Sequence, residues 1–146
     1  SLAAMKRALK PGGRIAAIVY STPEQNRFFS VPVSIIRRRA NLPPPQPGQP
    51  GPFSLGAPGR LEEVLRSAGL RDVQSVTLQA PLRMASAAEC LRFEQESFGA
   101  LHTMMSGLDA AAKAAAWHEI AVELARFARA GANAGPCELV VAAGSV

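Results

Sequence analysis

The chain has 146 residues, of which 48% are hydrophobic and 18% are charged. This length and balance predict one compact domain with one core, and they exclude a chain that is disordered throughout. Sixteen Lys and Arg residues outnumber eleven Asp and Glu residues, so the net charge is +5. A nucleic-acid-binding surface would fit this charge. Arginines spread along alanine-rich helices give the same balance, so we expect no nucleic-acid partner.

No run of apolar residues approaches the roughly 20 residues that a helix needs to span a bilayer, so we expect no membrane partner. The two cysteines, Cys90 and Cys137, lie far apart in the sequence and outside the spacings typical of metal ligands. We therefore expect two buried, reduced thiols, as in a cytoplasmic protein, and no bound metal.

A short helix is predicted at residues 2–9, because apolar residues recur there at helical spacing. Pro11 ends this helix, and Gly12 and Gly13 allow the chain to turn. Residues 15–20, with the sequence IAAIVY, are apolar on both alternating faces. This pattern predicts a strand that is covered on both sides, as in the parallel sheet of an α/β fold. Too few residues precede it for another strand and a crossover, so we expect the fold to extend beyond residue 1.

The next helix is predicted to begin at Thr22, whose hydroxyl can cap it, with Pro23 in the first helical position. Pro32 predicts a break in this helix or the start of a second one. The three arginines at 37–39 suit a helix C-terminus, because their positive charge complements the negative end of the helix dipole.

Residues 41–59 contain seven prolines and four glycines, a density that predicts a long irregular crossover loop. Phe53 and Leu55 are expected to anchor this loop to an apolar surface. Residues 59–70 have apolar side chains at i, i+3, i+4 and i+7, which predict an amphipathic helix. Residues 73–82 alternate between apolar and polar side chains and include a proline, so they predict an edge strand with one face in water.

Residues 86–131 are predicted to form two helices that are inserted before the last strand. Ser86, with a glutamate three residues later, is a capping-box signature for a helix that should run to about Met105. Asp109 can cap the second helix, which should end at Gly131.

Residues 137–143 are largely apolar and predict the closing strand. The side chains that could carry chemistry form no catalytic pattern. His102 and His118 belong to different predicted helices without an acidic partner nearby in the sequence. Glu94 and Glu96 point to different sides of their helix and make no acid–base pair. We therefore assign no catalytic residue.

The order and spacing of these elements resemble the C-terminal part of a class I S-adenosylmethionine-dependent methyltransferase. Residues 9–15 (LKPGGRI) resemble the turn into the fifth strand of these enzymes, and residues 61–73 resemble the helix and the entry to the sixth. Residues 137–143 fit the antiparallel seventh strand. Residues 21–29 (STPEQNRFF) and 51–55 (GPFSL) resemble a branch that modifies quinones and other small molecules. The resemblance implies an α/β, Rossmann-like fold: a three-stranded mixed sheet in the order first, last, middle, with helices packed on it.

The resemblance also shows which parts of such an enzyme this chain lacks. The loop that holds the cofactor should read Gly-x-Gly-x-Gly, and no stretch of the chain does. We therefore expect a truncated, substrate-side piece of an enzyme that uses S-adenosylmethionine to methylate a small molecule. Alone, the piece should neither bind the cofactor nor transfer methyl groups, and we assign it no cofactor-binding residue.

In such enzymes the residues after the fifth strand line the substrate side of the cofactor pocket. The resemblance thus makes five residues candidates for the substrate wall: Tyr20, Ser21, Asn26, Phe28 and Phe29. Alternatively, the two phenylalanines are ordinary core residues and Asn26 lies on a helix surface. Methyl transfer to an acceptor that is already nucleophilic depends mainly on proximity and desolvation, so the lack of a catalytic residue agrees with the resemblance.

If the rest of its sheet is missing, the strand Arg14–Tyr20 presents an unpaired apolar edge. We therefore expect self-association through this edge, most simply as a two-fold dimer. Two other interpretations stay open. The chain could be a stand-alone regulatory or interaction module whose proline-rich segment binds partners, or a basic nucleic-acid-binding domain. The coding sequence upstream of residue 1 distinguishes the module from the enzyme.

Overall fold

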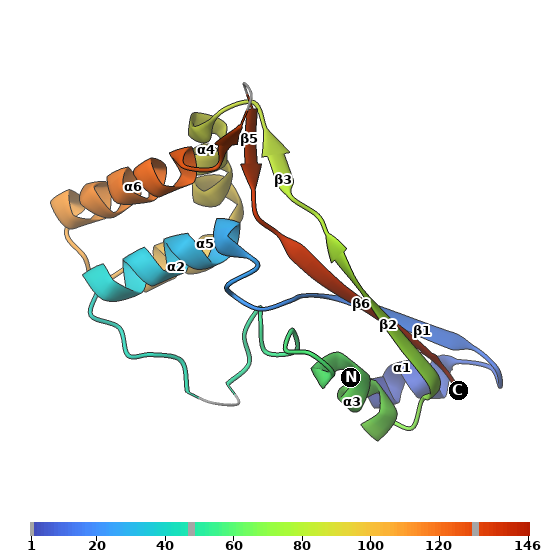
Figure 1. Cartoon of the computed structure of the whole chain (residues 1–146). Coiled ribbons are helices and arrows are strands. Elements are labelled where there is room, and N and C mark those ends of the chain that lie inside the picture. The colour runs from blue at the N-terminus through green and yellow to red at the C-terminus, as the bar shows by residue number, and fades with distance from the viewer. Residues whose placement is uncertain (1, 47–48, 130–131) are drawn as a thin grey trace. The chain divides into compact units, whose positions relative to one another are not determined.

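The computed structural model describes residues 2–46, 49–129 and 132–146. The contacts of the chain group into two compact units, whereas the length predicted a single core. Each unit has its own buried side chains, and the elements of both are labelled in Figure 1. The units, which we call the sheet unit and the helical unit, consist of Ser1–Gln25, Gly48–Ala80 and Glu138–Val146, and of Asn26–Pro47 and Pro81–Cys137, respectively.

The sheet unit contains α1 (Leu2–Ala8), β1 (Arg14–Tyr20), α3 (Arg60–Ser67), β2 (Arg71–Gln79) and β6 (Glu138–Ser145). Its strands lie in the order β1-β6-β2, which is the expected order of first, last and middle strand. β6 is antiparallel to both of its neighbours. The sheet is therefore antiparallel throughout and not mixed as expected, because β6 separates the two strands that run in the same direction.

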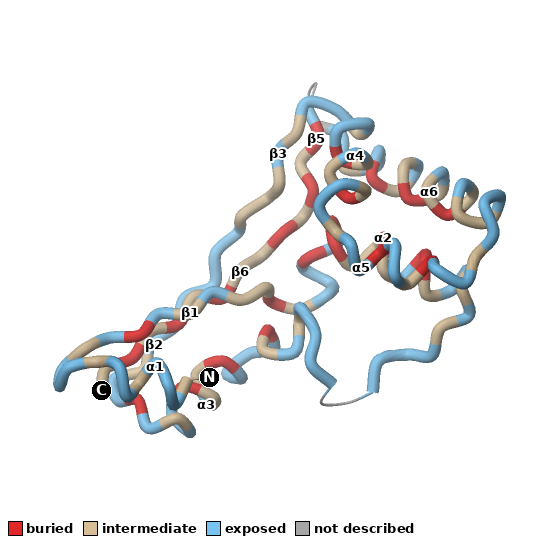
Figure 2. Tube along the Cα trace, turned by 180° about the vertical axis from the view of Figure 1, so that it is seen from behind, coloured by how far each residue is buried: buried red, intermediate tan, exposed pale blue. Residues whose placement is uncertain are grey.

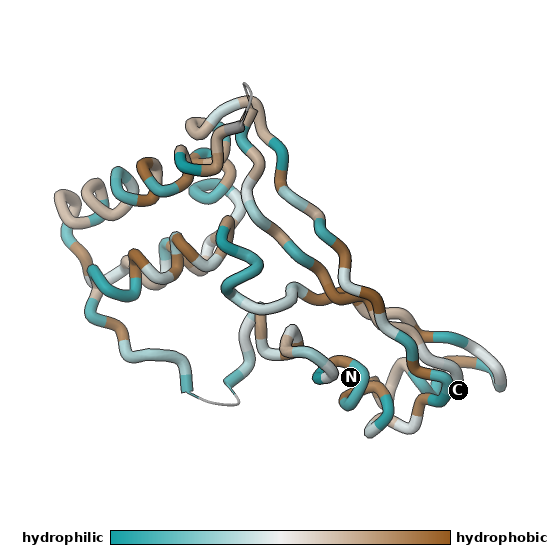
Figure 3. Tube along the Cα trace, viewed as in Figure 1, coloured by the Kyte–Doolittle hydropathy of each residue, from teal (hydrophilic) through white to brown (hydrophobic). Residues whose placement is uncertain are grey.

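The two faces of this sheet differ in burial. On one face Ile15 joins Leu61 and Leu65 of α3 in a buried cluster, and Leu2 of α1 packs against it. Ile18 and Val76, which lie on the other face, are 64% and 51% exposed. Figure 2 colours the chain by burial, and Figure 3 colours it by hydropathy. The expectation that β1 is covered on both sides is therefore wrong within the sheet unit, because α1 and α3 both pack against the same face.

The proline-rich loop has the predicted irregular conformation. Residues 42–46 and 49–59 contain turns but neither helix nor strand. Leu55 packs against the buried cluster of the sheet unit, as expected. The ring of Phe53 lies 6.1 Å from that of Tyr20, measured between centroids. The loop therefore contacts the sheet unit through the two apolar residues that were expected to anchor it.

The helical unit contains α2 (Arg27–Arg39), β3 (Leu82–Met84), α4 (Ala87–Ser97), α5 (Gly99–Met104), α6 (Ala110–Ala125), β4 (Ala128–Arg129) and β5 (Ala132–Gly135). α2 packs against α5 and α6, and α4 also packs against both. The three strands form a second antiparallel sheet in the order β3-β5-β4. This sheet was not predicted, because strands of two to four residues are too short to show an alternating pattern.

α2 differs from the predicted helix at two points. It begins at Arg27, with Asn26 in the N-cap position, whereas Thr22 was expected to cap it. Pro32 lies inside α2 and does not end it. A proline at this position removes one N–H donor from the helix, but its ring is buried together with Phe28. Packing within the unit therefore outweighs the local preference for a break.

The helix expected up to Met105 is interrupted at Phe98. The backbone of Phe98 has φ −115° and ψ 79°, outside the helical region, and it separates α4 from α5. The sequence pattern continues across this residue, because Phe98 supplies an apolar side chain at the spacing that a continuous helix would need. Periodicity therefore predicted one helix where the structure has two.

Both predicted caps of the later helices are confirmed. The Ser86 hydroxyl accepts a hydrogen bond from the backbone N–H three residues later (3.2 Å), and the Asp109 carboxylate does the same at α6 (2.7 Å). α6 ends at Ala125, earlier than expected. The expected end at Gly131 lies outside the described residues.

Candidate functional site

The five candidate substrate-wall residues are divided between the two units. Tyr20 and Ser21 belong to the sheet unit, and Asn26, Phe28 and Phe29 belong to the helical unit. The surroundings of these residues are therefore described for each unit by itself.

In the sheet unit, Ser21 connects the end of β1 to its neighbours. Its side chain is 3% exposed, and its backbone N–H donates to the carbonyl oxygen of Glu138 (3.0 Å). Its own carbonyl oxygen faces Gly56 of the proline-rich loop, where a Cβ atom would lie only 2.1 Å away. Ser21 therefore holds the strand end and the loop together, and beside it the Tyr20 ring packs on Phe53.

In the helical unit, Phe28 and Phe29 form an aromatic cluster with two phenylalanines that the sequence analysis did not select. Phe29 and Phe98 have ring centroids 5.2 Å apart, Phe93 and Phe98 5.7 Å, and Phe28 and Phe29 5.1 Å. The first two phenylalanines are buried, whereas Phe93 and Phe98 are half-buried. The cluster therefore has a buried side, formed by α2, and a partly exposed side.

Asn26 is fully buried and not a helix-surface residue. Its carbonyl oxygen accepts hydrogen bonds from the N–H groups of Phe29 (3.1 Å) and Ser30 (3.0 Å) at the start of α2. The N–H of Phe28 donates to the carbonyl oxygen of Pro136 (3.2 Å), so the first turn of α2 is tied to the end of β5. These contacts give Asn26 and Phe28 structural roles within the helical unit.

A group of buried polar side chains lies on α4 and β5. Glu94, Cys90 and Asn133 are each 1% exposed. The Asn133 amide nitrogen donates to the carbonyl oxygen of Leu124 (3.1 Å), while its oxygen and the Oε1 of Glu94 are buried without a hydrogen-bond partner. Burial raises the pKa of Glu94 to about 8, and it also raises the pKa of the Cys90 thiol, with a further contribution from the charge of Glu94.

The burial of Glu94 could have been predicted from the sequence. The sequence analysis considered only whether Glu94 and Glu96 form an acid–base pair. Cys90, Glu94, Phe98 and Leu101 are spaced by three or four residues, so Glu94 interrupts an otherwise apolar stripe. Such a position predicts a buried carboxyl. The free thiols of Cys90 and Cys137 are both buried, as expected.

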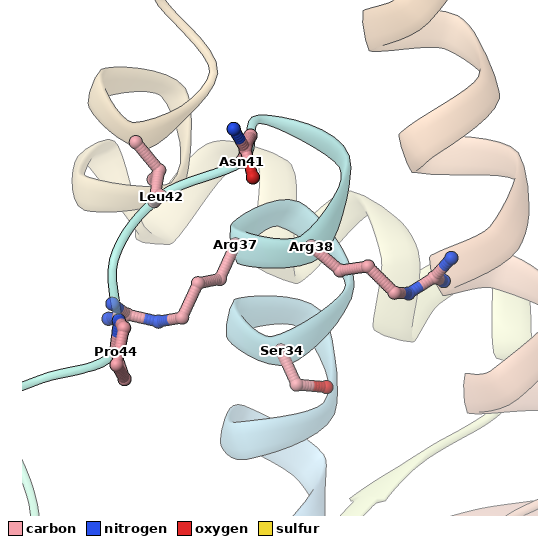
Figure 4. Close-up of a pocket in the computed structure, with 6 residues that line it drawn as sticks. All are labelled: Ser34, Arg37, Arg38, Asn41, Leu42 and Pro44. Atoms are coloured by element: carbon pink, nitrogen blue, oxygen red, sulfur yellow. The ribbon is translucent and has the colours of Figure 1, made fainter.

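An open hollow lies beside the C-terminal end of α2 (Figure 4). The Arg37 guanidinium donates to the carbonyl oxygen of Pro43, and the Arg38 side chain points the other way and pairs with Glu119. The two arginines therefore do not converge on a common point in the hollow, as binding of an anion would require. Its volume is about 370 Å³, and its lining residues are Ser34, Arg37, Arg38, Asn41, Leu42 and Pro44.

Two further polar side chains are engaged in ordinary structural contacts, and His118 is exposed. Arg39 pairs with Glu119 (2.7 Å), and Nε2 of His102 lies 2.7 Å from the carbonyl oxygen of Gln95. Among the described residues, no three His, Cys, Asp or Glu side chains gather as a metal site would need. None of the helices in the described part of the chain combines the length and the apolar character that crossing a bilayer requires.

The chain matches no protein-family model, and no curated protein is detectably similar to it. Its function must therefore be argued from the residues and the fold.

Proposed function

We propose that this chain is the C-terminal, substrate-side part of a cytoplasmic class I S-adenosylmethionine-dependent methyltransferase that acts on a small molecule. The observation that supports this proposal is the sheet order β1-β6-β2, with β6 antiparallel to both neighbours. The resemblance assigns these strands as fifth, seventh and sixth, of which the seventh is antiparallel. The turns in the two methyltransferase-like segments, residues 9–15 and 61–73, also fit. Gly12 and Gly69 both have positive φ there, +78° and +79°.

The residues of this chain do not fit the cofactor. The one pair of adjacent glycines precedes β1, and its backbone is already used: the N–H of Gly12 donates to Val146 and that of Gly13 to Lys10 (3.2 and 2.9 Å). The cofactor contacts of the enzyme therefore belong to residues outside this sequence. This chain would contribute apolar surface that orients the methyl acceptor and excludes water, which are the main needs of methyl transfer to a reactive acceptor.

The partly exposed side of the aromatic cluster is the best candidate for that surface. Phe93 and Phe98 are half-buried, and the ring of Phe98 makes edge-type contacts with those of Phe29 and Phe93. The part of these two rings that stays exposed could contact a planar acceptor such as a quinol. This assignment moves the proposed substrate contacts from Tyr20 and Ser21 to α4 and the start of α5.

Calorimetry and the upstream coding sequence test this proposal. Titration of the purified chain with S-adenosylmethionine should give no binding in the micromolar range, and micromolar binding would contradict the placement of the cofactor site. The codons before residue 1 should encode about 100 further residues, a typical remainder for such a domain, with a Gly-x-Gly-x-Gly loop. An upstream sequence without that loop would contradict the enzyme and favour the interaction module.

We also propose that the chain self-associates through β1. The N–H of Ser21 bonds to Glu138, and the N–H of Val146 bonds to Gly13 (2.9 Å). Because hydrogen-bonded pairs alternate in an antiparallel ladder, Ala16 and Ile18 between these points direct their backbone groups away from β6. An edge of this kind can pair with the same edge of a second copy.

A further inference from the structure

Glu94 is an acidic residue that is buried inside the helical unit. Its helix, α4, packs against α5, α6 and β3, and its side chain is 1% exposed. Its Oε1 has no hydrogen-bond partner within the described part of the chain. A carboxylate without a partner is costly to bury, far more so than the neutral acid.

We propose that Glu94 makes the helical unit a pH-sensitive latch, in which α4 stays packed while Glu94 is protonated and loosens when Glu94 loses its proton. The latch does not depend on the methyltransferase proposal, because it rests only on the interior of the helical unit.

The side chains of Cys90 and Asn133 do not offset the negative charge of a deprotonated Glu94. Cys90, one turn away on α4, is a neutral thiol, and β5 contributes the uncharged amide of Asn133. Burial is the cause of the raised pKa of Glu94, to about 8. Among the charged and titratable groups of these elements, Glu89, Arg83, Arg92, Glu96 and His118 are exposed, and His102, Glu119 and Glu123 bond to other partners. Lys113, near the start of α6, is half-buried.

The direction of the effect follows from the two states of Glu94. In the loosened state the carboxyl meets water and has its ordinary pKa of 4.5, whereas in the packed state its pKa is about 8. Between these values the packed state holds a proton that the loosened state releases. The equilibrium constant between the packed and the loosened state therefore shifts towards loosening by up to tenfold per pH unit from about pH 5, and it levels off above pH 8. Between pH 6 and pH 8 the rise is about 50-fold at most.

Cys90 reports the opening, because its thiol is as deeply buried as Glu94 and lies on the same helix. The experiment measures the rate at which N-ethylmaleimide modifies Cys90 from pH 6 to pH 9, with Cys137→Ser removing the second thiol. Dividing each rate by that of the Glu94→Gln variant at the same pH cancels the titration of the thiol itself. We expect this ratio to rise at least tenfold between pH 6 and pH 8 and by no more than about twofold from pH 8 to pH 9.

Glu96→Gln is the matched control, because Glu96 is exposed on the same helix. It should behave as the parent protein does. A ratio of the parent rate to the Glu94→Gln rate that does not change with pH would overturn the proposal. So would a ratio of the parent rate to the Glu96→Gln rate that rises with pH by the same factor. If Glu94→Gln does not fold, the parent protein decides: its unfolding constant should rise severalfold per pH unit between pH 6 and pH 7.5, and a constant value would overturn the latch.

Discussion

Gly56 is the position at which two segments of the sheet unit come into direct backbone contact. A Cβ atom there would lie 2.1 Å from the carbonyl oxygen of Ser21 and 2.2 Å from that of Tyr20. Both atoms are backbone, so neither can move aside as the end of a flexible side chain would. The absence of a side chain at residue 56 therefore allows the proline-rich loop to close on the end of β1.

We expect Gly56→Ala to destabilise the sheet unit by about 1–3 kcal/mol, because the added methyl group forces the loop away from Ser21. Gly51→Ala is the control, since a Cβ atom at Gly51 would meet nothing within 4 Å. Urea denaturation of the two variants and the parent measures the difference. Equal stability of the two variants would show that the loop does not pack closely on β1.

Glu94 and the phenylalanines show how far single residues were predictable. Phe28 and Phe29 were selected from the sequence, and both are buried in an aromatic cluster. Their partners Phe93 and Phe98 were not selected, because they lie more than 60 positions further along the chain and no local pattern links them. The burial of Glu94 could have been predicted from its apolar stripe, but the missing hydrogen-bond partner could not.

Among the helices and strands, β1 is the element whose burial differs most from what its apolar sequence predicted. Its apolar side chains occupy both faces, yet in the sheet unit only the face towards α1 and α3 is covered, and Ile18 is 64% exposed. Among the described strands, β1 pairs with β6 alone. An apolar strand with an open edge and an open face is a template for association.

We expect the parent chain to form a dimer, with twice the 15.3 kDa mass of one chain, in light scattering. Ile18→Lys should shift it towards the monomer, because a charge on an edge strand opposes pairing and Ile18 contributes little to the core. Val122→Lys, at a residue of α6 that is 47% exposed, should remain dimeric. A monomeric parent chain would refute association through β1, and equal dissociation of both variants would assign the effect to charge alone.

At the scale of the whole molecule, each unit has its own buried leucines and its own spectroscopic probe. Leu65 lies in the buried cluster of the sheet unit and Leu124 in the helical unit, and both are 0% exposed. The single tyrosine, Tyr20, belongs to the sheet unit, and the single tryptophan, Trp117, belongs to the helical unit. The stability of each unit can therefore be followed separately without adding a label.

We expect Leu65→Ala to lower the midpoint of the Tyr20 absorbance transition more than that of the Trp117 fluorescence transition. Leu124→Ala should do the reverse. Each substitution removes a buried side chain and leaves a cavity, at a cost of about 2–5 kcal/mol to the unit that contains it. Thermal or urea unfolding monitored at both chromophores provides the measurement. Coincident shifts in both signals for both variants would show that the two units unfold as one cooperative body.

The local features of this protein could be predicted from its amino-acid sequence. Caps at Ser86 and Asp109, the turn at Gly12, the irregular loop and the amphipathic helix α3 follow from groups within a few residues of one another. Only contacts between distant segments keep Pro32 within a helix, leave Oε1 of Glu94 without a hydrogen-bond partner in the described part of the chain, and cover β1 on one face. The reason is physical: burial depends on segments that are distant in the sequence, and their contacts can outweigh the preferences of any short stretch.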